Sequence, residues 1–271
     1  MAFVSVTTSS ERIAQRFAEL RVAGRRALVT YVTAGHPDPT SSLELLGSME
    51  SAGADVIEVG VPFSDPIADG PIIQASSQRA LEQGVTFDRT LRLVADAKVG
   101  IPVVLFTYLN PLVAAGRDAL ERAADAGVHG VLVTDLPLGA DPEREAWLGA
   151  GPLAFVRLVA PTTPRARMAK IAEHGGGFVY LISRLGVTGV RDELAPELAE
   201  TVGRLRGVTA LPICVGFGIS KPEQANAVAA MADGVVVGSA IVRAAADGPE
   251  PALQLIRAMR AAIDATAQRR Q

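Results

Sequence analysis

Short runs of almost continuous apolar residues recur along the chain, and longer polar-faced segments separate them. Apolar and polar positions do not alternate within a run, which is typical of parallel strands covered by helices. Each intervening segment is long enough for a helical crossover, which parallel strands require. The pattern therefore predicts eight strands, at Ala27–Val32, Val56–Val59, Val103–Phe106, Gly130–Thr134, Phe155–Val159, Phe178–Ile182, Ile213–Val215 and Gly234–Val237.

The segments between these runs carry residues typical of helix boundaries. Glycine stands before several strands, at Gly53, at Gly127 and in the triplet that ends at Gly177, where it can adopt the left-handed conformation that ends a helix. Helix, glycine and strand thus form a weakly repeated unit. Among the predicted helices are Glu11–Arg21 with Ser10 as its cap, Ser41–Ser51 after Pro39, and Glu223–Met231 after Pro222.

No linker or shift in composition divides the chain, so we expect residues 1–271 to form a single domain. Eight strand–helix units preceded by an extra N-terminal helix favour an α/β fold of the (β/α)₈ TIM barrel type. An open doubly wound sheet is the alternative. In a barrel, catalytic residues lie in the loops that follow the strands.

Composition excludes several classes of protein. Of the 271 residues 49% are hydrophobic and 20% are charged, which suffices for a large buried core. The net charge of −3, the lack of a basic tract and the 4% of aromatic residues argue against binding to nucleic acid. No apolar run reaches the roughly 20 residues that span a bilayer. The single cysteine, Cys214, lies in an apolar run and fits a reducing compartment, so we expect a cytoplasmic protein.

The sequence does not indicate a metal site, a serine hydrolase or a catalytic lysine that forms an imine. None of His36, His129 and His174 has a second ligand at metal-binding spacing, so we expect no metal site. His36 is expected in a solvated turn, and the other two histidines precede strands, where they have structural roles. The serine hydrolase motif Gly-x-Ser-x-Gly is absent. None of the three lysines lies within a predicted strand, so carbon–carbon cleavage here would need acid–base chemistry rather than an imine.

The densest polar signal follows the second strand. Glu58 lies inside that strand and points either into the barrel or toward the helices. Burial of a carboxylate is unfavourable unless it is paired or protonated, and it raises the pKa toward neutrality, as acid–base catalysis requires. A buried ion pair is the structural alternative. Asp65 and Asp69, in the loop that follows, are equally compatible with ordinary turn chemistry.

Small residues follow the last three strands, at Ser183–Gly189, Gly216–Ser220 and Gly238–Ala240. Glycine allows backbone N–H groups to approach an anion, and Gly238-Ser239 begins a short predicted helix. A phosphate site built after strands seven and eight recurs in TIM barrels. No Walker motif is present, so a small phosphomonoester is the expected ligand.

These residues resemble the alpha subunit family of tryptophan synthase over nearly the whole chain. The segment Glu58–Gly70 matches the family's signature, and Tyr180–Arg184 with Gly186–Gly189 matches its mobile sixth loop. The resemblance implies a lyase that cleaves indole-3-glycerol phosphate by a retro-aldol reaction to indole and glyceraldehyde 3-phosphate. It implies that Glu58 is the acid–base catalyst and that Asp69 binds the indole N–H and stabilises the positive charge that develops on the ring.

The resemblance also implies the rest of the site. Thr188 matches the threonine that helps to close the sixth loop over Asp69. Tyr31 stands where the family often has phenylalanine in the indole pocket, which puts the polarity of that pocket in question. The remaining ring residues near the strand ends are Tyr108, Tyr180 and Phe217, and the phosphate-binding residues are Gly189, Gly218, Gly238 and Ser239.

The family further implies a partner, the pyridoxal-phosphate-dependent beta subunit, in an α₂β₂ assembly. The loops with Asp65-Pro66 and Tyr108–Pro111 match its contact region. We expect no cofactor in this chain, because pyridoxal phosphate would belong to the partner. Two other functions stay open: a barrel enzyme for another phosphorylated sugar or indole precursor, and a subunit that mainly activates its partner.

Overall fold

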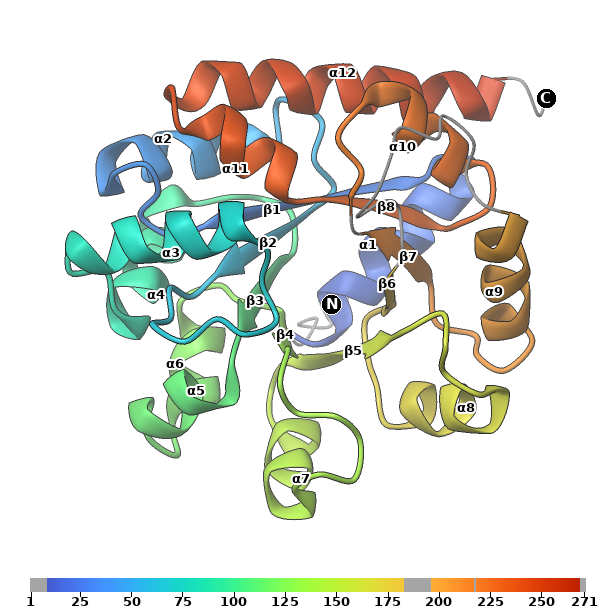
Figure 1. Cartoon of the computed structure of the whole chain (residues 1–271), viewed down its shortest axis with the longest axis horizontal. Helices are drawn as coiled ribbons and strands as arrows, with labels where there is room; N and C mark the ends of the chain where they lie inside the picture. Colours follow the sequence, from blue (N-terminus) through green and yellow to red (C-terminus); the bar gives the residue numbers. More distant parts are fainter. Residues whose placement is uncertain (1–8, 183–195, 217, 269–271) are drawn as a thin grey trace, which may run out of the picture.

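Eight parallel strands form a closed barrel in the computed structural model, which describes residues 9–182, 196–216 and 218–268 (Figure 1). Each strand pairs with the next along the chain, and β1 pairs with β8. The barrel is therefore confirmed over the open sheet, and all eight predicted strands lie within one residue of the observed bounds. The strands are β1 Ala27–Thr33, β2 Val56–Gly60, β3 Val103–Thr107, β4 Gly130–Val133, β5 Ala154–Val159, β6 Val179–Ile182, β7 Ile213–Gly216 and β8 Gly234–Val237.

Helices cover the outside of the barrel, and the longest, α12, crosses one side of it over α2, α10 and α11 (Figure 1). In the described ranges no helix combines the length and the apolar character that a membrane crossing needs. The helices are α1 Glu11–Val22, α2 Pro39–Met49, α3 Pro71–Glu82, α4 Phe87–Ala97, α5 Leu109–Ala115, α6 Ala119–Asp125, α7 Pro142–Ala150, α8 Arg165–Glu173, α9 Pro196–Arg206, α10 Pro222–Ala229, α11 Ser239–Ala245 and α12 Pro249–Gln268.

The structure corrects one predicted helix cap and one predicted helix start. Ser10 is the residue before α1, but its side chain makes no capping hydrogen bond to the helix. Helix α2 begins at Pro39, two residues earlier than predicted, because the Asp38 carboxylate accepts the N–H groups of Thr40 and Ser41 and so caps it. Proline occupies the first turn, where its missing N–H is not needed.

Alternate side chains of the strands divide the core into two layers. The outer layer lies between the strands and the helices, and the inner layer fills the barrel. Helix α1 contributes Ile13, Phe17 and Leu20 to the inner layer, and the Phe17 and Phe178 ring centroids lie 5.8 Å apart. The extra N-terminal helix therefore closes the end of the barrel at which the strands begin.

An ion-pair cluster ties both ends of the chain to this closed end. The buried Asp55 carboxylate accepts hydrogen bonds from Arg16 of α1 at 2.6 Å and from Arg260 of α12 at 2.9 Å. It also accepts the backbone N–H of Leu28, at the start of β1, at 2.8 Å. Asp55 thus joins α1, the barrel and α12, and leaves the opposite end, the mouth, for ligands.

Candidate active site

Glu58 projects from β2 into the barrel. Its neighbours Ile57 and Val59 belong to the outer core layer, so the alternation of the strand directs Glu58 inward. The side chain is 1% exposed, and its Oε1 accepts no hydrogen bond from the described residues. Burial raises the pKa of Glu58 to about 8. The carboxyl is therefore protonated for most of the time at neutral pH, and it forms no ion pair with the residues that the structure describes.

Asp69 is held in the loop after β2 by a residue that follows the next strand. The Tyr108 hydroxyl donates to Asp69 Oδ2 at 3.1 Å and accepts the Ala68 N–H at 2.9 Å. Burial raises the pKa of Asp69, and the hydrogen bond from Tyr108 opposes that shift. Asp69 is only half-buried, and unlike Glu58 Oε1 its Oδ2 accepts a hydrogen bond, so the two carboxyl groups lie in unlike environments.

The two carboxyl groups share one cavity of about 360 Å³ at the mouth of the barrel. Asp65 does not line it: this side chain is exposed and accepts a hydrogen bond from its neighbour Ser64. Of the predicted site residues, seven line the cavity: Tyr31, Glu58, Asp69, Tyr180, Gly218, Gly238 and Ser239.

Rings and aliphatic side chains form the wall of the cavity. The edge of the Tyr31 ring meets Phe106, with centroids 5.1 Å apart. The Tyr31 hydroxyl lies against Gly60, where a Cβ would be 2.1 Å away, and is hydrogen-bonded to the Thr33 hydroxyl at 3.4 Å. The strand neighbours of Tyr31 therefore accommodate its hydroxyl, and burial raises its pKa, so it stays protonated.

Tyr180 is placed in the same way from the other side of the barrel. A Cβ at Gly216 of β7 would lie 2.4 Å from the Tyr180 hydroxyl, so only glycine leaves room for it. Burial raises the pKa of Tyr180 well above its usual value. The cavity thus has a largely apolar interior lined by rings, which suits an aromatic ligand.

Polar backbone and small side chains lie at the rim. Gly238 precedes α11, and the exposed Ser239 is its first residue. Gly218 has φ of +82°, which favours glycine. Thr188, Gly189 and Phe217 lie outside the described residues. Ile73, Phe106 and Arg243 also line the cavity and were missed from the sequence.

The histidines lie outside the site, with one correction. His36 is buried rather than in a solvated turn, and burial lowers its pKa. His129 accepts the Val103 N–H at 3.2 Å, and the His174 ring contacts the Lys170 carbonyl at 2.8 Å, so both have the structural surroundings expected. Within the described ranges, no three His, Cys, Asp or Glu side chains gather as a metal site would need.

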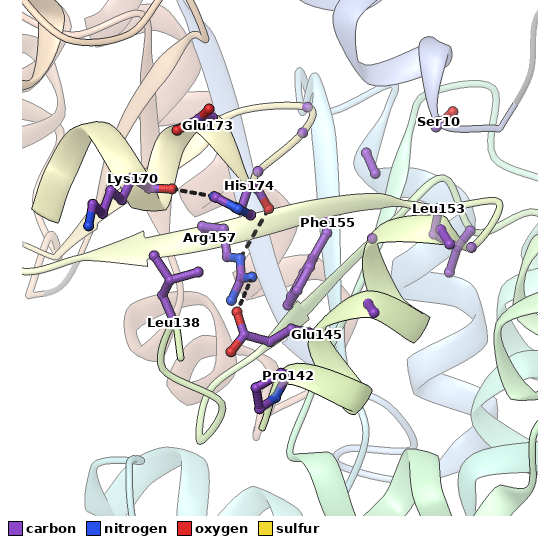
Figure 2. A pocket seen from close by; sticks show the side chains of 18 of the residues that line it. Ser10, Leu138, Pro142, Glu145, Leu153, Phe155, Arg157, Lys170, Glu173 and His174 are labelled. Carbon is purple, nitrogen blue, oxygen red and sulfur yellow. Dashed lines mark hydrogen bonds and ion pairs between the residues drawn. The ribbon is translucent and has the colours of Figure 1, made fainter. Parts of the chain in front are cut away.

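A larger cavity, of about 920 Å³, lies between α7 and α8 and shares no lining residue with the Glu58 cavity (Figure 2). Figure 2 shows Arg157 at its centre, where the guanidinium donates to Glu145 at 2.8 Å and to the His174 carbonyl at 3.2 Å. The guanidinium also lies 3.9 Å from the Phe155 ring centroid. The hydrogen bond from Arg157 lowers the pKa of Glu145 against the effect of burial, so these groups stabilise one another. The smaller cavity is therefore the candidate active site.

Comparison with known proteins gives the same answer from sequence and from fold. The family described as Tryptophan synthase alpha chain matches residues 17–269. The tryptophan synthase alpha chain of Citrifermentans bemidjiense is 48% identical over 235 residues, which are 86% of this chain and 88% of that one. The Carboxydothermus hydrogenoformans chain is 45% identical over 85% of this chain and 88% of its own.

Solved structures of the same description share the fold. The crystal structure of tryptophan synthase subunit alpha from Legionella pneumophila has a TM-score of 0.86 and 34% identity, and the match covers 94% of this chain and 98% of that one. A chain of tryptophan synthase from M. tuberculosis, in an aminoacrylate-bound form, has a TM-score of 0.83 and 34% identity over 93% of this chain and 99% of its own.

Proposed function

Because this chain belongs to the tryptophan synthase alpha chain family, and is the lyase that cleaves indole-3-glycerol phosphate in tryptophan biosynthesis, we propose that Glu58 and Asp69 carry out that cleavage. The observation that carries this assignment is the buried Glu58 carboxyl, which has a pKa of about 8 and shares a cavity with Asp69. Two carboxyl groups in unlike environments can take the acid role and the charge-stabilising role at the same pH.

Glu58 starts the reaction as an acid. Its protonated carboxyl donates a proton to C3 of the indole ring, which leaves a positive charge on the ring nitrogen. The resulting carboxylate then removes the proton of the glyceryl hydroxyl. As that O–H bond breaks, the C=O bond of glyceraldehyde 3-phosphate forms and the electrons of the carbon–carbon bond return to the ring. Indole is released, Glu58 is protonated again, and no net proton is consumed.

Asp69 stabilises the cation between these two steps. Its carboxylate faces the cavity, where it can accept the indole N–H, and Tyr108 fixes its orientation. A charged group that faces a developing opposite charge lowers the activation free energy most when it is already oriented before the reaction. The electron sink is the protonated ring itself, so the cleavage needs neither an imine nor a metal ion.

The remaining contacts follow from the shape of the cavity. We assign the indole ring to the wall of Tyr31, Phe106 and Tyr180, and the phosphate to the rim at Gly218, Gly238 and Ser239. Tyr108 acts through Asp69. Thr188, Gly189 and Phe217 keep the substrate-binding roles that the family motif gives them, as a proposal.

The alpha chain of this family carries no cofactor, and pyridoxal phosphate belongs to the beta chain. We assign this chain to an α₂β₂ assembly with a beta subunit that receives the indole. Two exposed apolar side chains support a contact surface where the family motif implies one: Ile67 follows Asp65-Pro66 and is 84% exposed, and Val113 follows Tyr108–Pro111 and is 39% exposed.

Two further assignments complete the proposal. We treat residues 1–271 as one domain, because the β1–β8 pair joins the first and last strands in one barrel. We place the protein in the cytoplasm, where its free, buried Cys214 would stay reduced.

The direct test is to mix the purified chain with indole-3-glycerol phosphate and to measure indole, with and without a beta subunit. We expect indole in both cases, and more of it with the partner. Glu58→Gln keeps the shape of the side chain and removes its proton transfer, so we expect substrate binding without cleavage. A Glu58→Gln variant with near-normal kcat would contradict the assignment. A subunit that only activates its partner would release no indole alone.

A further inference from the structure

The cavity needs a positive charge that the assigned residues do not supply. A phosphomonoester carries between one and two negative charges at neutral pH. The same cavity already holds the carboxyl groups of Glu58 and Asp69, and the assigned rim residues Gly218, Gly238 and Ser239 are uncharged. Among the described residues that line the cavity, Arg243 alone is cationic.

Helix α11 carries Arg243 on the side that faces the rim. Arg243 follows Ser239 by four residues, and positions four apart lie one above the other on the same face of a helix. Helical side chains lean toward the N-terminus of their helix, so the long Arg243 side chain leans back toward Ser239 and Gly238. Both Ser239 and Arg243 line the cavity, in agreement with this geometry.

The guanidinium of Arg243 is also available. The side chain is exposed, and in the part of the chain that the structure describes it makes no hydrogen bond, ion pair or ring contact. Other arginines of the fold differ in this respect: Arg157 and Arg260 are buried and bound to carboxylates. The guanidinium forms strong hydrogen bonds with phosphate oxygens, often two at once.

We propose that Arg243 binds the phosphate group of the substrate, in addition to the glycine and serine backbone at the rim. This inference rests on the proposed phosphate site and adds to it a side chain that the family motifs do not include. Because Arg243 lies at the rim, away from the bond that breaks, it strengthens substrate binding and takes no part in proton transfer. Because it is exposed, its attraction depends on ionic strength.

The test compares Arg243→Ala with Arg243→Lys and with a matched control, Arg92→Ala. Arg92 is an exposed arginine on α4 that does not line the cavity, so its removal changes the net charge equally. At low salt we expect Arg243→Ala to raise the KM for indole-3-glycerol phosphate about tenfold, with the loss in kcat/KM arising from KM. The KM of Arg243→Lys should lie between those of Arg243→Ala and the parent protein, and Arg92→Ala should have the KM of the parent protein.

Two probes separate phosphate binding from ring binding. Inorganic phosphate should inhibit the parent enzyme competitively, and its inhibition constant should rise in Arg243→Ala by a factor similar to that of KM. Binding of indole alone should be equal in the two proteins. The KM difference should shrink at 0.5 M salt, where exposed charges are screened.

Each outcome decides the point. If the parent enzyme cleaves the substrate and is inhibited by inorganic phosphate while Arg243→Ala has the same KM and inhibition constant at low salt, the role of Arg243 is wrong and the proposed function stands. An equal rise in Arg92→Ala would reduce the effect to net charge and overturn the inference. If the parent enzyme neither cleaves the substrate nor binds phosphate, the proposed function fails first, and this inference fails with it.

Discussion

The raised pKa of Glu58 predicts that this one carboxyl lowers the stability of the enzyme as the pH rises. Folding moves its pKa from the ordinary value of 4.5 to about 8. The folded protein therefore keeps a proton in a pH range where the unfolded chain releases it. The contribution of the protonated Glu58 to the free energy of unfolding is fully present below pH 4.5. It is lost progressively as the pH rises and is gone above pH 8.

The size of this effect follows from the two pKa values. Each pH unit between them corresponds to about 1.4 kcal/mol of unfolding free energy. The expected loss is about 3 kcal/mol at pH 7 and about 5 kcal/mol above pH 8, because the ionised carboxylate is buried with Oε1 unbonded. Glu58→Gln keeps the shape and cannot ionise, so at pH 7 it should be more stable than the parent by about this amount, roughly 5 °C in Tm.

The assay is thermal unfolding of both proteins at a series of pH values from 4.5 to 9. The difference between the two Tm values isolates Glu58, because every other titrating group is common to both. It should be close to zero at pH 4.5 and grow toward pH 8. A difference that stays constant over this range would refute the reasoning. In parallel, kcat/KM of the parent should fall above pH 8, because in the proposed mechanism Glu58 starts the reaction protonated.

Three further substitutions test other parts of the structure. Asp69→Asn should lower kcat at least a hundredfold in the indole assay, since the cation loses its counter-charge; a loss of less than tenfold would contradict this role. Gly238→Asp should weaken substrate binding more than tenfold by calorimetry, whereas Gly238→Asn should weaken it far less; equal values for the two variants would exclude charge repulsion. Asp55→Ala should lower the free energy of unfolding by about 3 kcal/mol in urea, because the buried Arg260 then keeps only the partly exposed Asp264 as an anionic partner and the Leu28 N–H loses its acceptor; an unchanged urea midpoint would contradict the role of Asp55.

The strands could be predicted because the barrel covers both of their faces, so each reads as an apolar run. The direction of Glu58 could not, since an apolar run does not reveal which face is the interior. Only closure of the barrel, with Ile57 and Val59 packed against helices, directs Glu58 inward. The motifs and the family resemblance identify Glu58 and Asp69 as site residues, but they do not give the environment of either carboxyl group.

Contacts between loops were beyond the sequence. Tyr108 was expected as a ring against the substrate, but its hydroxyl holds Asp69, a residue 39 positions away in the loop after the preceding strand. His36 stands in a segment rich in Gly, Pro and Asp, which is typical of a solvated turn, yet it is buried and hydrogen-bonded to the backbone of Val242 in α11. Tertiary packing overrides the local signal there. Arg243 could have been predicted from the sequence, because its spacing of four residues from Ser239 places both on the same face of α11.

The closed end of the barrel bears on the order in which the two products leave. Ile13 and Phe17 of α1 pack into that end, so a product cannot pass through it. The cavity also has depth, because Glu58 and Tyr180 are buried whereas Ser239 is exposed at the rim. In the proposed binding mode, with the phosphate at the rim and the ring at depth, glyceraldehyde 3-phosphate stands between indole and the solvent. In the isolated chain it must depart first, and indole follows unless a partner subunit opens another route for it.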